Sequence, residues 1–222
     1  MKKTEKLFRF YTRLILSKLT GNKASTIIQF LKYIREASDA CIYYHTHRFL
    51  QIHQHLCPEP PNDFAYWVGN IFKEEELAEK LASIDTIQFT TIKSLRDKIV
   101  SIIEECLKRN PKLRFKFVEI GQEFHFIEAM SFIMPTKHTA RNLKEFVDSL
   151  KKVTINSVYY HMFEARIRLE KGSNDFSSWF DAVLNDKELA DKVAKMDPYS
   201  FTMEGLRCRI ISLIEAKLLK ND

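Results

Sequence analysis

The sequence predicts a mainly α-helical protein. We expect a tandem duplication of a helical domain of roughly 100 residues, with short β segments at the start of each copy and a pseudo-twofold relation between the copies. Three observations predict this fold class. The chain nearly repeats itself, apolar residues recur at spacings of three and four through most of each half, and alternation is confined to the openings of the halves. With 5 glycines and 6 prolines, a turn-rich all-β fold is disfavoured.

The repeat is clearest in the middle of each half. Residues 62–89 align with residues 174–201, and eleven of these 28 positions are identical. The triplet Tyr-Tyr-His at 43–45 matches the same triplet at 159–161. Asn110-Pro111 punctuates the chain between the copies, so the sequence predicts a first repeat domain at 1–112 and a second at 113–222.

The β segments are predicted where phenylalanines alternate with other residues. Phe8 and Phe10 open the first copy, and Phe124 and Phe126 hold the matching places in the second. In the second copy we also expect a short hairpin, with residues 115–117 as the other arm and Gly121-Gln122 as its turn.

Helices are predicted through the rest of each copy. One follows Thr20 and ends near Ile34, and a long amphipathic helix covers 92–106. The candidate N-caps are polar residues that stand before apolar runs, because their side chains can accept from the first helical N–H groups. They are Ser38 or Asp39 and Asn62 in the first copy, and Ser157 and Asn174 in the second.

Charge and cysteine usage narrow the class of protein. The formal net charge is +6, and nine of the basic residues lie in residues 1–35 beside a single acid. A basic excess confined to one end does not form the aromatic-interleaved stripe of a nucleic-acid binder, so we do not expect nucleic acid as a partner. The four cysteines are far apart, and no apolar run approaches the ~20 residues of a membrane span. We therefore expect a cytoplasmic protein that does not engage a membrane.

Two segments carry a resemblance to a known family. They are YYHTHRFL at 43–50 and PEPPNDFAYWV at 58–68, extended by the stretch from Leu77 to Asp85. With them the chain resembles an uncharacterised prokaryotic family, a domain of unknown function. The resemblance implies a cytoplasmic protein with no assigned activity, and it supplies no catalytic residue.

Histidines are the first candidates for chemistry. His45 and His47 stand two residues apart, a spacing that in a strand would place both rings on one side, as metal sites often require. In a helix the same spacing points the rings to nearly opposite faces. Because the surrounding periodicity is helical, we expect no metal and no cofactor, with a metal at His45 and His47 as the alternative.

A second candidate site joins the two copies. His45 and His161 occupy equivalent places, and Asp63 and Asp175 follow them in equivalent helices. Imidazole and carboxylate together suit general acid–base catalysis near neutral pH, so these four residues are the catalytic candidates. The bland alternative is that Tyr-Tyr-His fills the core and that Asn-Asp caps a helix.

Candidate binding residues are His47, Trp67 and Trp179, since indole rings can stack on an aromatic or sugar ring. No phosphate-binding or hydrolase motif is present. We therefore expect a non-catalytic binding or regulatory module whose partner is a protein or a small-molecule ligand. The alternative is a hydrolase or transferase with a His/Asp site, with or without metal, in a cleft between the repeats.

Overall fold

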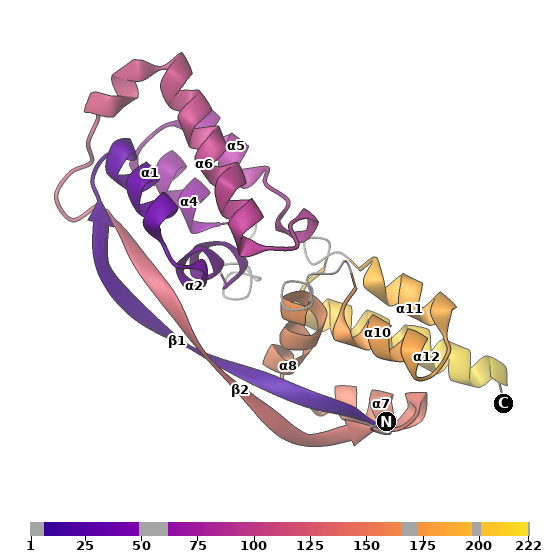
Figure 1. Ribbon diagram of the computed structural model, residues 1–222. Coiled ribbons are helices and arrows are strands. Elements are labelled where there is room, and N and C mark those ends of the chain that lie inside the picture. Colours follow the sequence, from indigo (N-terminus) through magenta and orange to yellow (C-terminus); the bar gives the residue numbers. More distant parts are fainter. Residues whose placement is uncertain (1–6, 49–61, 166–172, 197–200, 222) are drawn as a thin grey trace, which may run out of the picture. The chain divides into compact units, whose positions relative to one another are not determined.

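The computed structural model describes residues 7–48, 62–165, 173–196 and 201–221 (Figure 1). Most of these residues are helical. Two strands, β1 (Phe8–Ala24) and β2 (Phe124–Ala140), run antiparallel and pair with each other in one two-stranded sheet. None of the described helices is both long and apolar enough to cross a membrane.

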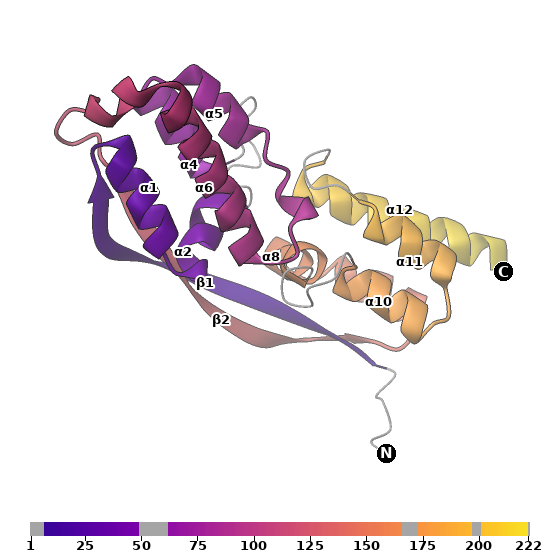
Figure 2. The ribbon, with the colours of Figure 1, turned by 45° about the horizontal axis from the view of Figure 1, so that its top comes forward.

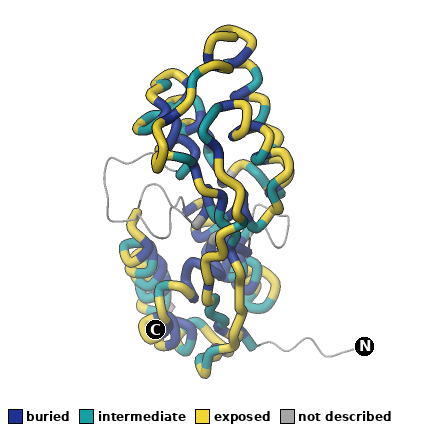
Figure 3. Tube along the Cα trace, turned by 90° about the vertical axis from the view of Figure 1, so that its left-hand side faces the viewer, coloured by how far each residue is buried: buried dark blue, intermediate teal, exposed yellow. Residues whose placement is uncertain are grey.

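The predicted fold class is wrong, because its β segments do not open two separate repeats. Each strand is 17 residues long, and its partner is the other strand, more than 100 positions away in the chain. The alternation of phenylalanines marks only the end of each strand that packs on helices. The middle of the ribbon is largely exposed on both faces and therefore carries no alternating pattern (Figure 3).

Two local predictions also fail, because the strands are longer than expected and pair with each other. Thr20 lies inside β1, and the following helix, α1 (Ile27–Glu36), begins later, with Thr26 as its N-cap. The expected hairpin around Gly121 is absent from the described chain: Phe115 ends a 3-10 helix (Pro111–Phe115), and Phe117 forms an isolated antiparallel bridge with Thr26. The strand at Phe124 pairs with β1 instead of with its own neighbour in sequence.

The described chain forms two compact units, and each strand contributes to both. Unit 2 spans Ile15–Met130, and unit 1 consists of Met1–Leu14 with Ser131–Asp222. The helices of unit 2 after α1 are α2 (Asp39–Tyr43), α4 (Asp63–Tyr66), α5 (Glu75–Ala82) and α6 (Ile92–Arg109). Short π turns at Tyr44–Arg48 and Trp67–Ile71 extend α2 and α4, and a 3-10 turn lies at Thr86–Gln88.

Unit 1 has a similar order of helices. They are α7 (Leu143–Leu150), α8 (Ile155–Tyr159), α10 (Asp175–Ala182), α11 (Lys187–Ala194) and α12 (Met203–Asn221), with a π turn at Tyr160–Glu164 after α8 (Figure 2). The capping predictions for Ser38, Asn62 and Asn174 are confirmed, since each side chain accepts from a backbone N–H in the first turn. At α8 the N-cap is Thr154, and Ser157 lies inside the helix.

The aromatic core of each unit includes the end of a strand from the other half of the sequence. In unit 1, Phe10 of β1 packs on Phe146 of α7, with ring centroids 5.3 Å apart. In unit 2, Phe124 of β2 packs on Phe30 of α1 at 5.1 Å. All four rings are buried. The helices of each unit therefore bury apolar area against a strand from the other half of the sequence.

Candidate functional site

His45 lies at the second position of the π turn after α2 and is almost fully buried, at 2% exposure. Its Nδ1 atom lies 2.7 Å from Oδ2 of Asp63, the first residue of α4. Its Nε2 atom accepts a hydrogen bond from the backbone N–H of Ile127 in β2 at 2.9 Å. The ring therefore connects the end of one helix, the start of another and the strand.

His161 has the same surroundings in unit 1. It lies at the second position of the π turn after α8, and its Nδ1 atom is 2.7 Å from Oδ2 of Asp175, the first residue of α10. Its Nε2 atom accepts from the backbone N–H of Tyr11 in β1 at 2.8 Å. The structure therefore pairs each candidate histidine with the candidate aspartate of its own unit.

These partners assign the tautomer of both rings. A backbone N–H can only donate, so Nε2 of each ring must carry a lone pair, and the proton of a neutral imidazole must lie on Nδ1. Nδ1 then donates to the aspartate, which orients the ring. In this geometry both nitrogens of each ring are engaged within the protein. Neither ring then presents a lone pair to a metal or a proton to a substrate.

The hydrogen bonds of the histidines belong to a wider set that satisfies the outer edge of each strand. In unit 1 the Ser157 hydroxyl donates to the carbonyl oxygen of Tyr11 at 2.6 Å, beside the His161 contact. In unit 2 the aligned position is Cys41, whose thiol contacts the backbone of Ile127. Burial, and then the nearby charge of Glu128, raise the pKa of the Cys41 thiol to about 12.

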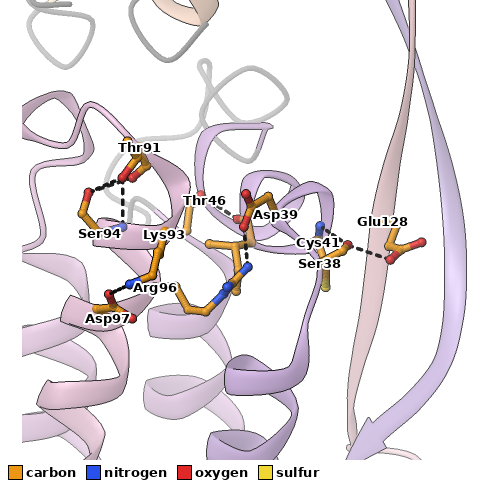
Figure 4. Close-up of polar contacts among 11 residues, drawn as sticks. Ser38, Asp39, Cys41, Thr46, Thr91, Lys93, Ser94, Arg96, Asp97 and Glu128 are labelled. Atoms are coloured by element: carbon orange, nitrogen blue, oxygen red, sulfur yellow. Dashed lines mark hydrogen bonds and ion pairs between the residues drawn. The ribbon is translucent and has the colours of Figure 1, made fainter. Parts of the chain in front are cut away.

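The N-caps of α2 and α8 also contact the strands. Ser38 accepts from the N–H of Cys41 and donates to Oε1 of Glu128 on β2 at 2.7 Å, as Figure 4 shows. In unit 1 the hydroxyls of Thr154 and Thr12 lie 3.3 Å apart. These side-chain contacts join the N-terminal ends of α2 and α8 to β2 and β1.

His47 is buried beside the His45 site but points elsewhere. Its ring stacks on Tyr43, with centroids 5.4 Å apart and planes 3° apart, and its Nδ1 lies 3.0 Å from Oγ1 of Thr46. Burial lowers the pKa of His47 from 6.5 to about 4. Across the described ranges, no cluster of three or more His, Cys, Asp or Glu side chains is arranged to hold a metal ion.

Trp67 and Trp179 are packed in the cores of their units, with 4% and 7% of their surface exposed. Trp67 stacks on Phe30 at 4.9 Å, and its Nε1–H donates to the carbonyl of Gln122 at 2.9 Å. Trp179 stacks on Phe146 at 5.6 Å. These ring faces are covered by phenylalanines. The proline-rich segment 58–61, which carries part of the family resemblance, lies outside the described residues.

Sequence reasoning missed the partners of the histidines. The donors to Nε2 are backbone N–H groups of Tyr11 and Ile127, which lie 150 and 82 positions away from the rings they contact. Every residue except proline carries such a donor, so no side-chain pattern marks these two positions. A signal was present only in the helices, as the aligned His and Asp of the two halves.

The chain matches one family model and is similar to a solved structure. The model of a family described as "Family of unknown function (DUF5752)" matches residues 5–215. The chain is similar to a solved structure described as "The structure of OrfY from Thermoproteus tenax", with 26% sequence identity, a TM-score of 0.77 and 97% of each chain covered. No match is found among curated proteins.

Proposed function

We propose that this chain, which belongs to the DUF5752 family of unknown function, is a non-catalytic binding or regulatory module in which the two His–Asp pairs are structural clamps. One observation carries the proposal. Each imidazole uses Nδ1 for an aspartate and Nε2 for a strand N–H. A general base needs an available lone pair and a metal ligand needs the same, so a ring in this state supplies neither.

The energetic role of the clamps supports this proposal. A buried backbone N–H left without an acceptor destabilises a protein by about 1–3 kcal/mol. His45 and His161, each 2% exposed, accept from the N–H groups of Ile127 and Tyr11 in part-buried hydrogen bonds. The same contacts hold β1 and β2 against the helices on which their phenylalanines pack. The retention of both histidines is therefore explained by folding without any reaction.

The tautomer of the rings provides a direct test. Long-range ¹H–¹⁵N correlation spectra of histidine-labelled protein at neutral pH should show Nδ1 protonated and Nε2 unprotonated for both His45 and His161. The exposed His125 of β2 serves as the reference ring. A protonated Nε2 at His45 or His161 would contradict the clamp, because that nitrogen could not accept the strand N–H.

A screen for activity separates the proposal from the alternative of a hydrolase or transferase. We expect no stoichiometric metal and no turnover of phosphate ester, carboxylic ester or glycoside substrates. Turnover that is lost in His45→Ala, while circular dichroism and the melting curve show an intact fold, would overturn the proposal. Turnover that survives in that variant would place chemistry elsewhere and would also count against a module without activity.

We also propose that the chain arose by internal duplication, with repeat segments 1–112 and 113–222. The pairs of equivalent contacts support this history. Thr20 donates to the carbonyl of Phe126 and Thr136 to that of Phe10, both at 2.9 Å. Asn62 donates to Leu81 O and Asn174 to Val193 O. Each compact unit then combines the helices of one segment with strand residues of both.

A cytoplasmic location is retained as part of the proposal. The three cysteines in the described ranges, Cys41, Cys106 and Cys208, are free thiols, which suits a reducing compartment. The partner that we expect is a protein or a small-molecule ligand.

A further inference from the structure

The segment between α6 and β2 exposes large apolar side chains to an unusual degree. Ile120 is 100% exposed, Phe115 83% and Phe117 75%, which places all three among the four most exposed large hydrophobic residues that the structure describes. We call residues 112–120 the apolar–basic loop. In Figures 1 and 2 this part of the chain follows the end of α6 and leads to β2. Exposed apolar side chains gathered in one segment mark an interaction site.

Contacts with the rest of unit 2 hold the backbone of the loop in place, so the exposed side chains extend from an ordered segment. Leu113 and Val118 are buried at 4% and 8% exposure and anchor the loop at two points. The N–H of Val118 donates to Ser25 O at 2.9 Å, beside the bridge between Phe117 and Thr26. Ordering the backbone in advance lowers the entropy lost when the loop binds.

Basic side chains surround the apolar ones. Lys112 and Arg114 are exposed on the loop, and Lys108 is exposed on the last turn of α6 just before it. The neighbouring Arg109 is paired with Glu76 at 3.6 Å and with Glu105 at 4.0 Å. Lys116 is committed within unit 2, since its Nζ bonds to Lys73 O at 3.0 Å and pairs with Glu74. Between residues 108 and 120 the only acid is Glu119. The exposed cations and apolar side chains together favour a partner that is negatively charged and also offers an apolar environment.

We propose that the apolar–basic loop docks on the surface of an anionic lipid bilayer. Phe115, Phe117 and Ile120 enter the boundary between headgroups and acyl chains, while Lys112 and Arg114 contact lipid phosphates. Peripheral binding of this kind combines buried apolar area with electrostatic attraction. A single-stranded nucleic acid would use the two phenylalanine faces, but Ile120 has no π face on which a base can stack. An anionic bilayer can contact all five side chains, because it offers an apolar layer to Phe115, Phe117 and Ile120 and phosphates to Lys112 and Arg114.

This inference departs from the expectation of no membrane, which rested on the lack of an apolar stretch long enough to span one. Spanning requires ~20 apolar residues, whereas peripheral docking requires only a few exposed side chains and cations. The inference rests on the proposed function in that it names a partner for a binding module.

Co-sedimentation with lipid vesicles tests the proposal. The wild-type chain should bind vesicles in which about one third of the lipid is phosphatidylglycerol at least ~10-fold more tightly than pure phosphatidylcholine vesicles, and binding should weaken as salt screens the charges. The triple variant Phe115→Ser/Phe117→Ser/Ile120→Ser should lose at least ~10-fold in partitioning. The variant Lys112→Gln/Arg114→Gln should lose several-fold and lose most of the salt dependence.

Matched controls lie on unit 1. Leu219 is 79% exposed, so Leu219→Ser changes an exposed apolar residue outside the loop. Lys144 and Lys152 are exposed, so Lys144→Gln/Lys152→Gln removes the same charge as the loop variant. Both controls should bind anionic vesicles as the wild type does. All variants alter exposed side chains, and their melting curves are compared with that of the wild type.

Three outcomes would overturn the proposal. They are equal binding to the two kinds of vesicle, unchanged binding of the triple variant, and loss of binding in the controls to the same extent. Binding to a single-stranded oligonucleotide, or self-association, that the triple variant abolishes while vesicles are not bound would assign the loop to that partner instead. The clamp proposal fails separately, because the histidine tautomers and the activity screen do not depend on vesicle binding.

Discussion

Nε2 of His45 accepts the backbone N–H of Ile127 at 2.9 Å, so a ring on a helix turn caps a donor on a strand 82 positions further along the chain. Nδ1 of the same ring is held by Asp63. His161 makes the matching contacts with Tyr11 and Asp175. The two rings thus join the helices of each unit to the strand that completes its core.

The first prediction concerns the stability supplied by these rings. His45→Ala and His161→Ala should each lower the free energy of unfolding by about 3 kcal/mol, because a part-buried N–H loses its acceptor and a cavity forms where the buried ring stood. Urea unfolding monitored by circular dichroism measures the loss. His125→Ala, on the exposed side of β2, should change the stability by less than about 0.5 kcal/mol. Equal effects at the three positions would speak against the clamps.

The aspartates should show graded effects. Asp63→Asn keeps an oxygen that can accept from Nδ1–H of His45, whereas Asp63→Ala removes it. We expect a loss of about 1 kcal/mol for the asparagine and about 2 kcal/mol for the alanine, since the bond to a charged acceptor is the stronger one. The same order should hold at Asp175. An asparagine variant as unstable as the alanine variant would show that charge, and not acceptance of the proton, is what the site requires.

The sharing of strands between units leads to a prediction about where destabilisation appears. Phe10 packs on Phe146 in unit 1, and Phe126 packs on Phe30 in unit 2. Phe10→Ala should lower the stability by about 3–5 kcal/mol and speed amide exchange in α7 and α10, although Phe10 lies in the first strand. Phe126→Ala should do the same in α1 and α4. Hydrogen-exchange mass spectrometry measures both effects. Faster exchange in α1 and α4 for Phe10→Ala, or in α7 and α10 for Phe126→Ala, would contradict the sharing of strands between the units.

Acid should destabilise the protein through His47. Burial lowers its pKa to about 4 in the folded state, against 6.5 for the unfolded chain. Between these values the unfolded chain binds a proton that the folded protein excludes, so stability falls as the pH drops from about 6.5 to about 4. The stability is fully retained above that window, and the total loss is about 3 kcal/mol.

A natural control for this prediction stands at the aligned position of the other half, where the residue is Phe163. His47→Phe cannot bind the proton, so its free energy of unfolding should decline less between pH 6.5 and pH 4 than that of the wild type. Urea unfolding across this pH range provides the comparison. Parallel pH profiles for the two proteins would show that His47 does not contribute to acid sensitivity.

The starts of α2, α4 and α10 were predictable because the residues involved are close in sequence. Ser38, Asn62 and Asn174 each accept from an N–H three positions ahead, so the signal and its effect lie in one short stretch. The stripe that buries Leu95, Ile99 and Ile103 on α6 is equally local, since it follows from the period of the helix. The expected membership of a family of unknown function is also confirmed, by a family model that matches residues 5–215.

The sequence by itself determined that the described chain is mostly helical, that Ser38, Asn62 and Asn174 are N-caps, and that His and Asp recur in both halves. Only the tertiary structure decided that β1 pairs with β2, that each unit takes a strand end from the other part of the chain, and that both imidazole nitrogens are occupied. The physical reason is the range of the interactions. The hydrogen bonds of a helix join residues four positions apart, so a short stretch of sequence contains both partners. The partner of a strand, and the N–H group that donates to a histidine ring, can lie at any distance along the chain. Both contacts use backbone groups that nearly all residues share, so no side-chain pattern marks them.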